Sequence, residues 1–147
     1  MGMTVKPKED NVELKFRLLD HEADVGLEVY GKTLEELFIN AAKGMFYLII
    51  DGDNIEVEKG KRLDIVKDGE LLINFLNELL YLWDTEGFIP TEFSIKIEGD
   101  TLKGSVVGGL FDPRRLRIKQ EIKAATYHSF LLTQENGIYR ARIILDV

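Results

Sequence analysis

The sequence of 147 residues contains no cysteine, only three prolines and two histidines, and a single tryptophan. Without cysteine, disulfide bonds and thiolate-ligated zinc are excluded, and this composition fits the cytoplasm. No apolar run reaches the length of a membrane span, and residues 1–11 hold no apolar core of a secretory signal. We therefore expect a cytoplasmic protein with no membrane partner.

Positive charge is also in short supply, because 26 acidic residues outnumber 19 basic residues and leave a net charge of −7. Such a chain repels phosphate backbones on average, so we expect no DNA partner and no tight, autonomous binding of RNA. The basic run 114–119 is the best candidate for a direct RNA contact. It holds no aromatic residue for base stacking, so a solvated connector is the preferred interpretation.

Apolar residues recur with a period of two in some segments and with a helical period in others, which predicts a single α+β domain. We expect two helices packed on an antiparallel sheet, with residues 1–10 as a flexible tail and 11–147 as the folded domain. The predicted helices are 33–49 and 69–85, and the predicted strands are 13–19, 25–30, 54–58, 62–66, 93–97, 102–107, 122–133 and 138–147.

Short local signals set some of the boundaries between these elements. Thr33 and Glu36 form a capping box at the start of the first helix, and Asp68 is expected to cap the second. Gly44 inside the first helix costs about 1 kcal/mol relative to alanine, which a close crossing of another backbone would explain. The Asn-Gly step at 136–137 predicts a hairpin between the last two strands, whereas 13–19 and 25–30 either form a hairpin or lie apart.

Carboxylates gather in the segment 20–26, which also holds a histidine, and again at the end of the sequence. Asp146 and Val147 end the last predicted strand and would present a side-chain and a terminal carboxylate together. If Asp24 lies near them, three carboxylates converge and require a cation such as Ca²⁺ or Mg²⁺. The alternative, which the pattern alone favours, is that Asp24 caps a turn and Asp146 is solvated.

Motifs for catalysis are weak in this sequence. His128 and Ser129 are neighbours on a predicted strand, so their side chains point to opposite faces and form no dyad. A metal-dependent phosphohydrolase would depend on His21, Glu22 or His128 as its general base, and this stays an open alternative. Lys123 lies on a strand, where lysine is usually exposed and structural; it would otherwise offset the acidic cluster or contact a phosphate on a partner.

The sequence resembles the archease family in segments that stand in family order and span nearly the whole chain after the tail. These segments are 20–26, 31–38, 41–46, 78–88, 121–128 and 144–147. Each is weak alone, but together they are highly specific. The resemblance implies a small α+β protein built on a strand-helix-strand-strand module.

The resemblance also implies a function, which is not enzymatic. It implies a protein cofactor of the GTP-dependent RNA ligase that seals tRNA halves after intron removal. Such a cofactor promotes guanylylation of the ligase's active-site histidine, allows multiple turnover and can widen the nucleotide specificity. By the same resemblance, Asp24, Asp146 and Val147 form a metal site expected to hold calcium, and His21 and Lys123 join the two aspartates in ligase activation.

Two departures from the family pattern qualify this expectation. Asp20 and Glu22 replace a glutamate and a threonine, which leaves open whether Glu22 joins the metal site. Leu116 stands where many members have a histidine, so no role can be given to an imidazole there. The alternative functions are the phosphohydrolase and a chaperone-like modulator of another tRNA-processing enzyme, such as a tRNA methyltransferase, whose basic surface would suit an acidic protein.

Overall fold

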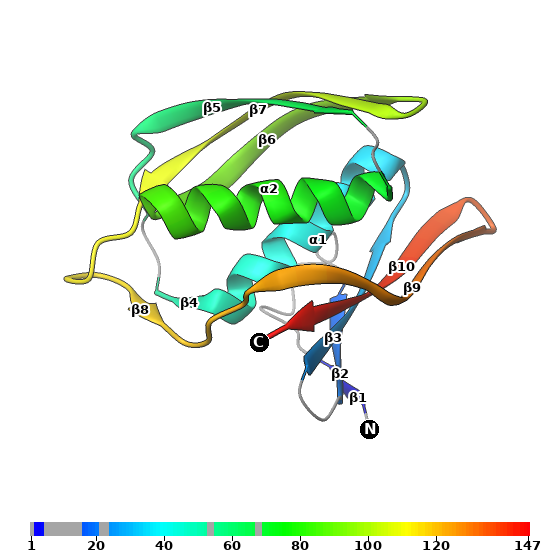
Figure 1. Cartoon of the computed structure of the whole chain (residues 1–147), viewed down its shortest axis with the longest axis horizontal. Helices are drawn as coiled ribbons and strands as arrows, with labels where there is room; N and C mark the ends of the chain where they lie inside the picture. The colour runs from blue at the N-terminus through cyan, green and yellow to red at the C-terminus, as the bar shows by residue number, and fades with distance from the viewer. Residues whose placement is uncertain (1, 5–15, 21–23, 53–54, 67–68) are drawn as a thin grey trace.

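The computed structural model describes residues 2–4, 16–20, 24–52, 55–66 and 69–147, and it places two helices between two antiparallel sheets (Figure 1). The predicted α+β class is confirmed. In chain order the elements are β1 (Gly2–Thr4), β2 (Phe16–Asp20), β3 (Asp24–Gly31), α1 (Leu34–Ile49), β4 (Ile50–Asp51), β5 (Lys59–Val66), α2 (Leu71–Glu86), β6 (Phe88–Glu98), β7 (Thr101–Leu110), β8 (Arg117–Ile118), β9 (Ala124–Glu135) and β10 (Ile138–Asp146).

The strands form three antiparallel sheets. The largest has the order β1-β2-β3-β10-β9, a second has the order β5-β7-β6, and β4 pairs with β8. Both helices contact both large sheets, so the protein has a helical layer with a sheet on each side (Figure 1). The prediction of one sheet beneath the helices was therefore incomplete. Within the described residues, neither helix is long and apolar enough to cross a membrane.

The hairpins follow the local signals. β2 and β3 pair directly. Of the two arrangements left open for the first two predicted strands, the hairpin is therefore the one that forms. Asn136 and Gly137 join β9 to β10 with φ values of 53° and 76°. A two-residue turn with positive φ at both positions matches the twist of the flanking strands, so the predicted hairpin is confirmed.

The start of α1 carries the predicted capping box. The Glu36 amide donates to Thr33 Oγ1 at 3.0 Å. The Glu36 carboxylate accepts from the Lys32 amide at 2.7 Å, one residue before the position that the motif usually reaches. These bonds satisfy amides that a helix start leaves without partners inside the helix.

The close approach expected at Gly44 is present, but side chains make it. A Cβ atom at Gly44 would lie 3.1 Å from Phe16 Cγ and 3.3 Å from Leu27 Cδ1. Both residues belong to the largest sheet and are buried. The prediction of a crossing backbone was wrong, and glycine here lets α1 lie close over apolar side chains of β2 and β3.

Aromatic rings connect the layers of the core. Phe38 of α1 and Phe75 of α2 have ring centroids 5.6 Å apart, and Phe75 lies 6.4 Å from Phe93 of β6. At the other end of α2, Trp83 meets Phe111 edge to face at 5.6 Å. Burial of such rings supplies much of the free energy of folding, at about 25 cal/mol per Å² of apolar area.

Several predicted boundaries differ from the structure. Residues 55–58 form no strand, and β5 runs through the glycine at 60 where a break was expected. The N-cap of α2 is Glu70, without a side-chain cap bond, while Asp68 lies outside the described residues. β7 continues to Leu110 because its pairing with β6 extends to Phe88, and β9 begins only at Ala124.

At the beginning of the chain, Gly2–Thr4 pair with β2, so part of the expected 1–10 tail has strand geometry. The flexibility expected of that tail and the proposed domain limits stay predictions.

Gly31 provides a test of how β3 turns into α1. A Cβ atom there would overlap the Leu37 amide nitrogen and lie 2.7 Å from Leu37 Cα. Because these are backbone atoms of the first helical turn, we expect Gly31→Ala to lower the free energy of unfolding by about 1–3 kcal/mol in urea melts. Gly60→Ala is the control, since its Cβ atom would find Val107 Cγ1 at an ordinary 3.5 Å. Equal losses in both variants would contradict this account.

Candidate functional site

Asp24 and Asp146, far apart in the sequence, are direct partners in the pairing of β3 with β10. Register partners point to the same face of a sheet, with Cβ atoms about 4.5–5.5 Å apart. Both aspartates are half-buried. Their neighbours in the ladder, Val25 and Leu145, point to the other face and pack against the core. The structure therefore brings together the two aspartates that the sequence analysis singled out.

A polar network lies on the same face of these strands. Glu28 is only 2% exposed, and it accepts a hydrogen bond of 2.6 Å from the Tyr30 hydroxyl. Arg140 of β10 lies 4.0 Å from the second oxygen of Glu28. Residues 24, 28 and 30 share one face by the alternation of β3. Polar interactions on this face thus help to fix the register that aligns the aspartates.

Lys123 and Val147 lie beside the aspartates. The Lys123 amide donates to the Asp146 carbonyl at 2.7 Å, which extends the β9–β10 ladder beyond Ala124. The Lys123 side chain is exposed and makes no ion pair with a described carboxylate. Val147 is half-buried and packs against the core. The structure thus places Lys123 next to the acidic pair without an ionic bond to it.

The donor chemistry of the pair fits a hard cation. Carboxylate oxygens are preferred ligands of Ca²⁺ and Mg²⁺, and like charges at register positions are unfavourable without a counter-charge. Among the described residues, no three His, Asp or Glu side chains are grouped closely enough to hold a metal. His21 and Glu22 lie outside the described residues. A cation here would need oxygens from Val147, water or a partner besides Asp24 and Asp146.

Asn77 of α2 attaches the helix to this end of the sheet. Its side-chain Nδ2 donates to the Ala125 carbonyl at 3.0 Å, and its Oδ1 accepts from the Ala125 amide at 2.8 Å. β9 is an edge strand, so the outward backbone groups of Ala125 have no strand to pair with. The amide of Asn77 replaces that strand at one residue and fixes α2 against the segment that carries Lys123.

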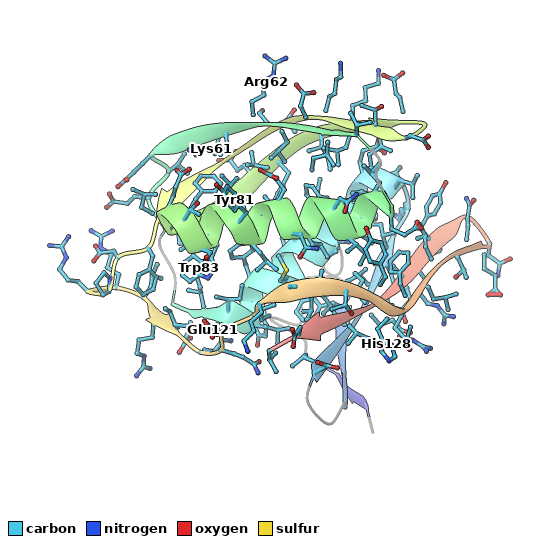
Figure 2. The ribbon with its side chains drawn as sticks, in the orientation of Figure 1. Lys61, Arg62, Tyr81, Trp83, Glu121 and His128 are labelled. Atoms are coloured by element: carbon cyan, nitrogen blue, oxygen red, sulfur yellow. The ribbon has the colours of Figure 1, made fainter. Side chains whose placement is uncertain are left out.

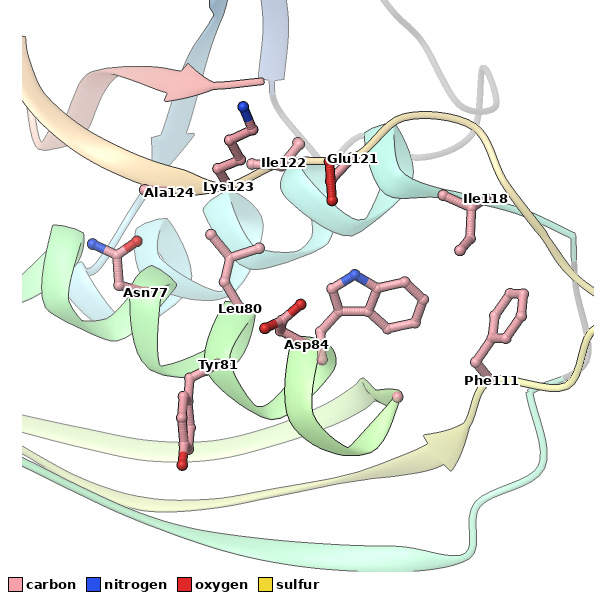
Figure 3. Close-up of a pocket in the computed structure, with 12 residues that line it drawn as sticks. Asn77, Leu80, Tyr81, Asp84, Phe111, Ile118, Glu121, Ile122, Lys123 and Ala124 are labelled. Atoms are coloured by element: carbon pink, nitrogen blue, oxygen red, sulfur yellow. The ribbon is translucent and has the colours of Figure 1, made fainter.

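A groove of about 970 Å³ lies between the second half of α2 and the segment 118–124 (Figure 3). We call it the α2 groove. Its apolar walls include Trp83, Phe111 and Ile118, and its acidic residues are Asp84 and Glu121. The sequence analysis missed it, because a groove depends on how α2 meets a connector. One signal was available: residues 71–86 contain three acids and no basic residue.

The basic run 114–119 is largely neutralised by nearby acids. Arg114 donates to Asp112 and lowers the pKa of that carboxyl, and Asp112 raises the pKa of Arg114. Arg115 lies 2.7 Å from Glu56, and Arg117 lies 3.6 Å from Asp51. The preferred interpretation of a solvated connector agrees with these pairs.

Two other residues of the run face the protein itself. Lys119 lies 4.1 Å from the centre of the Tyr47 ring, and Leu116 is buried in the core.

The residues considered for hydrolysis do not form a site in the part of the chain that the structure describes. His128 is exposed on β9 (Figure 2), where the pairing with β10 shifts register. Ser129 has a φ of 53°, in the left-handed region, so the two residues do not follow regular strand alternation. The other two candidates for a general base, His21 and Glu22, lie outside the described residues.

Comparisons with known proteins agree on one family. A model of the archease protein family matches residues 16–147. The protein archease of Pyrococcus furiosus is 39% identical over 137 residues, which cover 87% of this chain and 95% of that relative. The protein archease of Archaeoglobus fulgidus is 36% identical over 141 residues, which cover 91% of this chain and 100% of the relative.

Solved structures show the same fold. The solution structure of Methanobacterium thermoautotrophicum protein 1598 has a TM-score of 0.75 at 36% identity and covers 90% of this chain and 98% of its own. A crystal structure from Thermotoga maritima, described as an archease and possible chaperone, has a TM-score of 0.60 at 23% identity. It covers 88% of this chain and 94% of its own. None of these relatives is named for an enzymatic reaction.

The Asn77 attachment gives a testable prediction for stability. Asn77→Ala leaves the amide and carbonyl of Ala125 without their side-chain partner, and we expect it to lower the free energy of unfolding by about 1–3 kcal/mol. Asn74→Ala makes the same residue change in the same helix but removes only an exposed bond of 3.1 Å from Tyr127, so about 0–1 kcal/mol is expected. Urea unfolding compares the two variants, and hydrogen exchange at the Ala125 amide checks the cause. A loss no larger in Asn77→Ala than in Asn74→Ala would refute the assigned role.

Proposed function

Since the chain belongs to the archease family, we propose that it is a cytoplasmic, non-enzymatic protein cofactor of the GTP-dependent RNA ligase that seals tRNA halves. It promotes guanylylation of the ligase's active-site histidine and repeated turnover, and it widens the ligase's use of nucleotides. The observation that carries the proposal is the alignment of Asp24 with Asp146 on one face of the sheet. Contact with tRNA is indirect, through the ligase.

The acidic pair is the part of the surface that acts on the ligase. Asp24 and Asp146 hold a divalent cation, with calcium expected, and Val147 supplies further oxygen ligands. When bound, the cation supplies positive charge that offsets the repulsion within the pair and polarises oxygen ligands. Lys123 acts beside the pair, where its ammonium is available to an anionic group of the complex, and His21 also takes part in ligase activation.

Activation requires that the cofactor binds one state of the ligase better than another. A ligand shifts a conformational equilibrium only by its difference in affinity for the two states. The acidic pair is suited to this task because the ladder of β3 and β10 holds it in one geometry. A ligase conformation that is ready for guanylylation and matches this geometry gains population, and release after each cycle permits further turnover.

A second candidate is chaperone-like modulation of another tRNA-processing enzyme, such as a tRNA methyltransferase. The description of the Thermotoga maritima protein as a possible chaperone and the exposed α2 groove favour it. The ligase proposal stands first because it gives a role to the aligned aspartates.

The ligase proposal predicts the effect of removing either aspartate. With the cognate ligase, GTP and a broken RNA, the wild-type protein at well below stoichiometric amounts is expected to raise ligase turnover. Asp24→Ala and Asp146→Ala are each expected to abolish this stimulation, with far-UV circular dichroism and melting cooperativity retained.

Asp100→Ala serves as the control, since Asp100 is an exposed aspartate in the turn between β6 and β7. If wild-type protein leaves ligase turnover unchanged, the ligase proposal fails. If both site variants lose their fold, the two aspartates are structural. Release of phosphate from nucleotide or RNA without ligase would support the hydrolase alternative instead.

The cation predicts a second, independent result. A ligand that binds only the folded state at 100 times its Kd stabilises a protein by about 2.7 kcal/mol. We therefore expect CaCl₂ to raise the melting temperature of wild-type protein after treatment with a chelator, and to raise it far less in Asp24→Asn. Equal shifts in the two proteins would show that calcium does not bind at the aspartates, and a larger shift with MgCl₂ would correct the identity of the metal.

A further inference from the structure

We propose that the α2 groove is a docking site for a protein segment in which an arginine stands beside an apolar side chain. This inference goes beyond the role of the acidic pair, since it concerns a different surface and the chemistry of what covers it. It rests on the proposed function only for the identity of the partner. The groove lies open along α2, with a volume of about 970 Å³.

The apolar part of the groove has room for one or more partner side chains. Trp83 is half-buried, with one edge against Phe46 in the core at 6.3 Å and contact with Phe111 at 5.6 Å. Ile118 and Tyr81 line the same groove and are 55% and 62% exposed. Large apolar and aromatic side chains that converge on one concavity at the surface are typical of interaction sites.

The charge of the groove selects a cationic partner. Asp84 and Glu121 approach it from opposite walls, one from α2 and one from the connector (Figure 3). Both are exposed, and neither has an ion pair or side-chain hydrogen bond with a described residue. The acids that contact the basic run 114–119 differ in this respect, because Asp112 and Glu56 are paired with its arginines.

The end of α2 adds to this negative potential. Its last turn contains no basic residue, although a helix C-terminus carries about half a negative charge. Asp84 and Glu86 are therefore placed where acids are unfavourable for the helix itself. Glu86 is compensated by Lys61 at 2.6 Å, whereas no described residue forms an ion pair with Asp84. The uncompensated charge lies at the groove.

Arginine fits this combination better than lysine or a nucleic acid. Its planar guanidinium stacks on an indole and binds carboxylates through two parallel hydrogen bonds. RNA bases would also stack on Trp83, but two carboxylates with no ion pair to a described residue repel the adjacent phosphates. Lys123 lines the groove as well, yet Figure 3 shows its side chain extending away from Asp84. The occupant is therefore a protein segment with arginine and an apolar residue.

The single tryptophan makes the groove measurable without any ligase. The probe is a capped peptide, acetyl-Gly-Leu-Arg-Arg-Gly-amide, titrated while the Trp83 fluorescence is recorded. We expect a saturable change, and about tenfold weaker binding by the double variant Asp84→Asn, Glu121→Gln. The control is Glu135→Gln with Glu92→Gln, which removes the same charge from exposed positions on other strands. Equal weakening by both double variants would mean non-specific attraction and would overturn the proposal.

Further probes exclude other occupants. A peptide with aspartates for the arginines, one with serine for the leucine, and a single-stranded oligo-uridine RNA are expected to bind more weakly than the arginine peptide. Tighter binding of RNA would overturn the proposal in favour of a nucleic-acid site. A fluorescence change on dilution of the protein alone would show that a second copy fills the groove, and it would also overturn the proposal.

The ligase assay separates this inference from the proposed function. We expect the Asp84→Asn, Glu121→Gln variant to need about tenfold more protein for half-maximal stimulation, with the same maximum at saturation. Asp24→Ala instead loses the maximum. If wild-type protein binds the peptide but does not stimulate the ligase, the ligase function fails and the groove stands. If stimulation is normal in the groove variant and the peptide does not bind, the groove proposal fails alone.

Discussion

The pairing of β3 with β10 is the interaction on which the rest of the arrangement depends. It joins the second strand of the first hairpin to the last strand of the sequence, and it runs from the Tyr139–Gly31 pair to the Asp146–Asp24 pair. A slip of one residue would turn Leu27 and Ile143, both fully buried, away from the helices. Core packing therefore fixes the register, and the register in turn sets the two aspartates side by side.

The segment 121–124 connects the paired strands β3 and β10 to α2. On one side its backbone continues the ladder, through the bond from the Lys123 amide to Asp146. On the other side it lines the α2 groove, and Asn77 binds the adjacent Ala125 to the helix through two hydrogen bonds. The acidic pair and the groove thus share one hydrogen-bonded segment. A partner that covers the groove lies close to the end of β10, where the aspartates stand.

Local signals in the sequence predicted those features that depend on a few neighbouring residues. The Thr33 cap, the Asn136–Gly137 turn and the α+β class all follow from short-range chemistry and periodicity. The pairing of Asp24 with Asp146 required a fold, and the sequence pattern alone favoured the opposite interpretation; only the family resemblance pointed to it. The second sheet, the side chains over Gly44 and the α2 groove depend on packing between distant segments, for which one sequence carries no direct signal.

The distribution of paired and unpaired charge indicates which class of partner the surface suits. The basic run, where RNA binding was considered, is occupied by internal ion pairs with Asp112, Glu56 and Asp51. To bind a phosphate backbone, these arginines would first have to exchange their carboxylates for phosphates, which reduces the gain from each contact. The acids of the α2 groove need no such exchange, because no described residue pairs with them. An acidic protein built in this way gains more from a basic protein surface than from RNA, which supports the proposed action on an RNA-processing enzyme with only indirect contact with its RNA substrate.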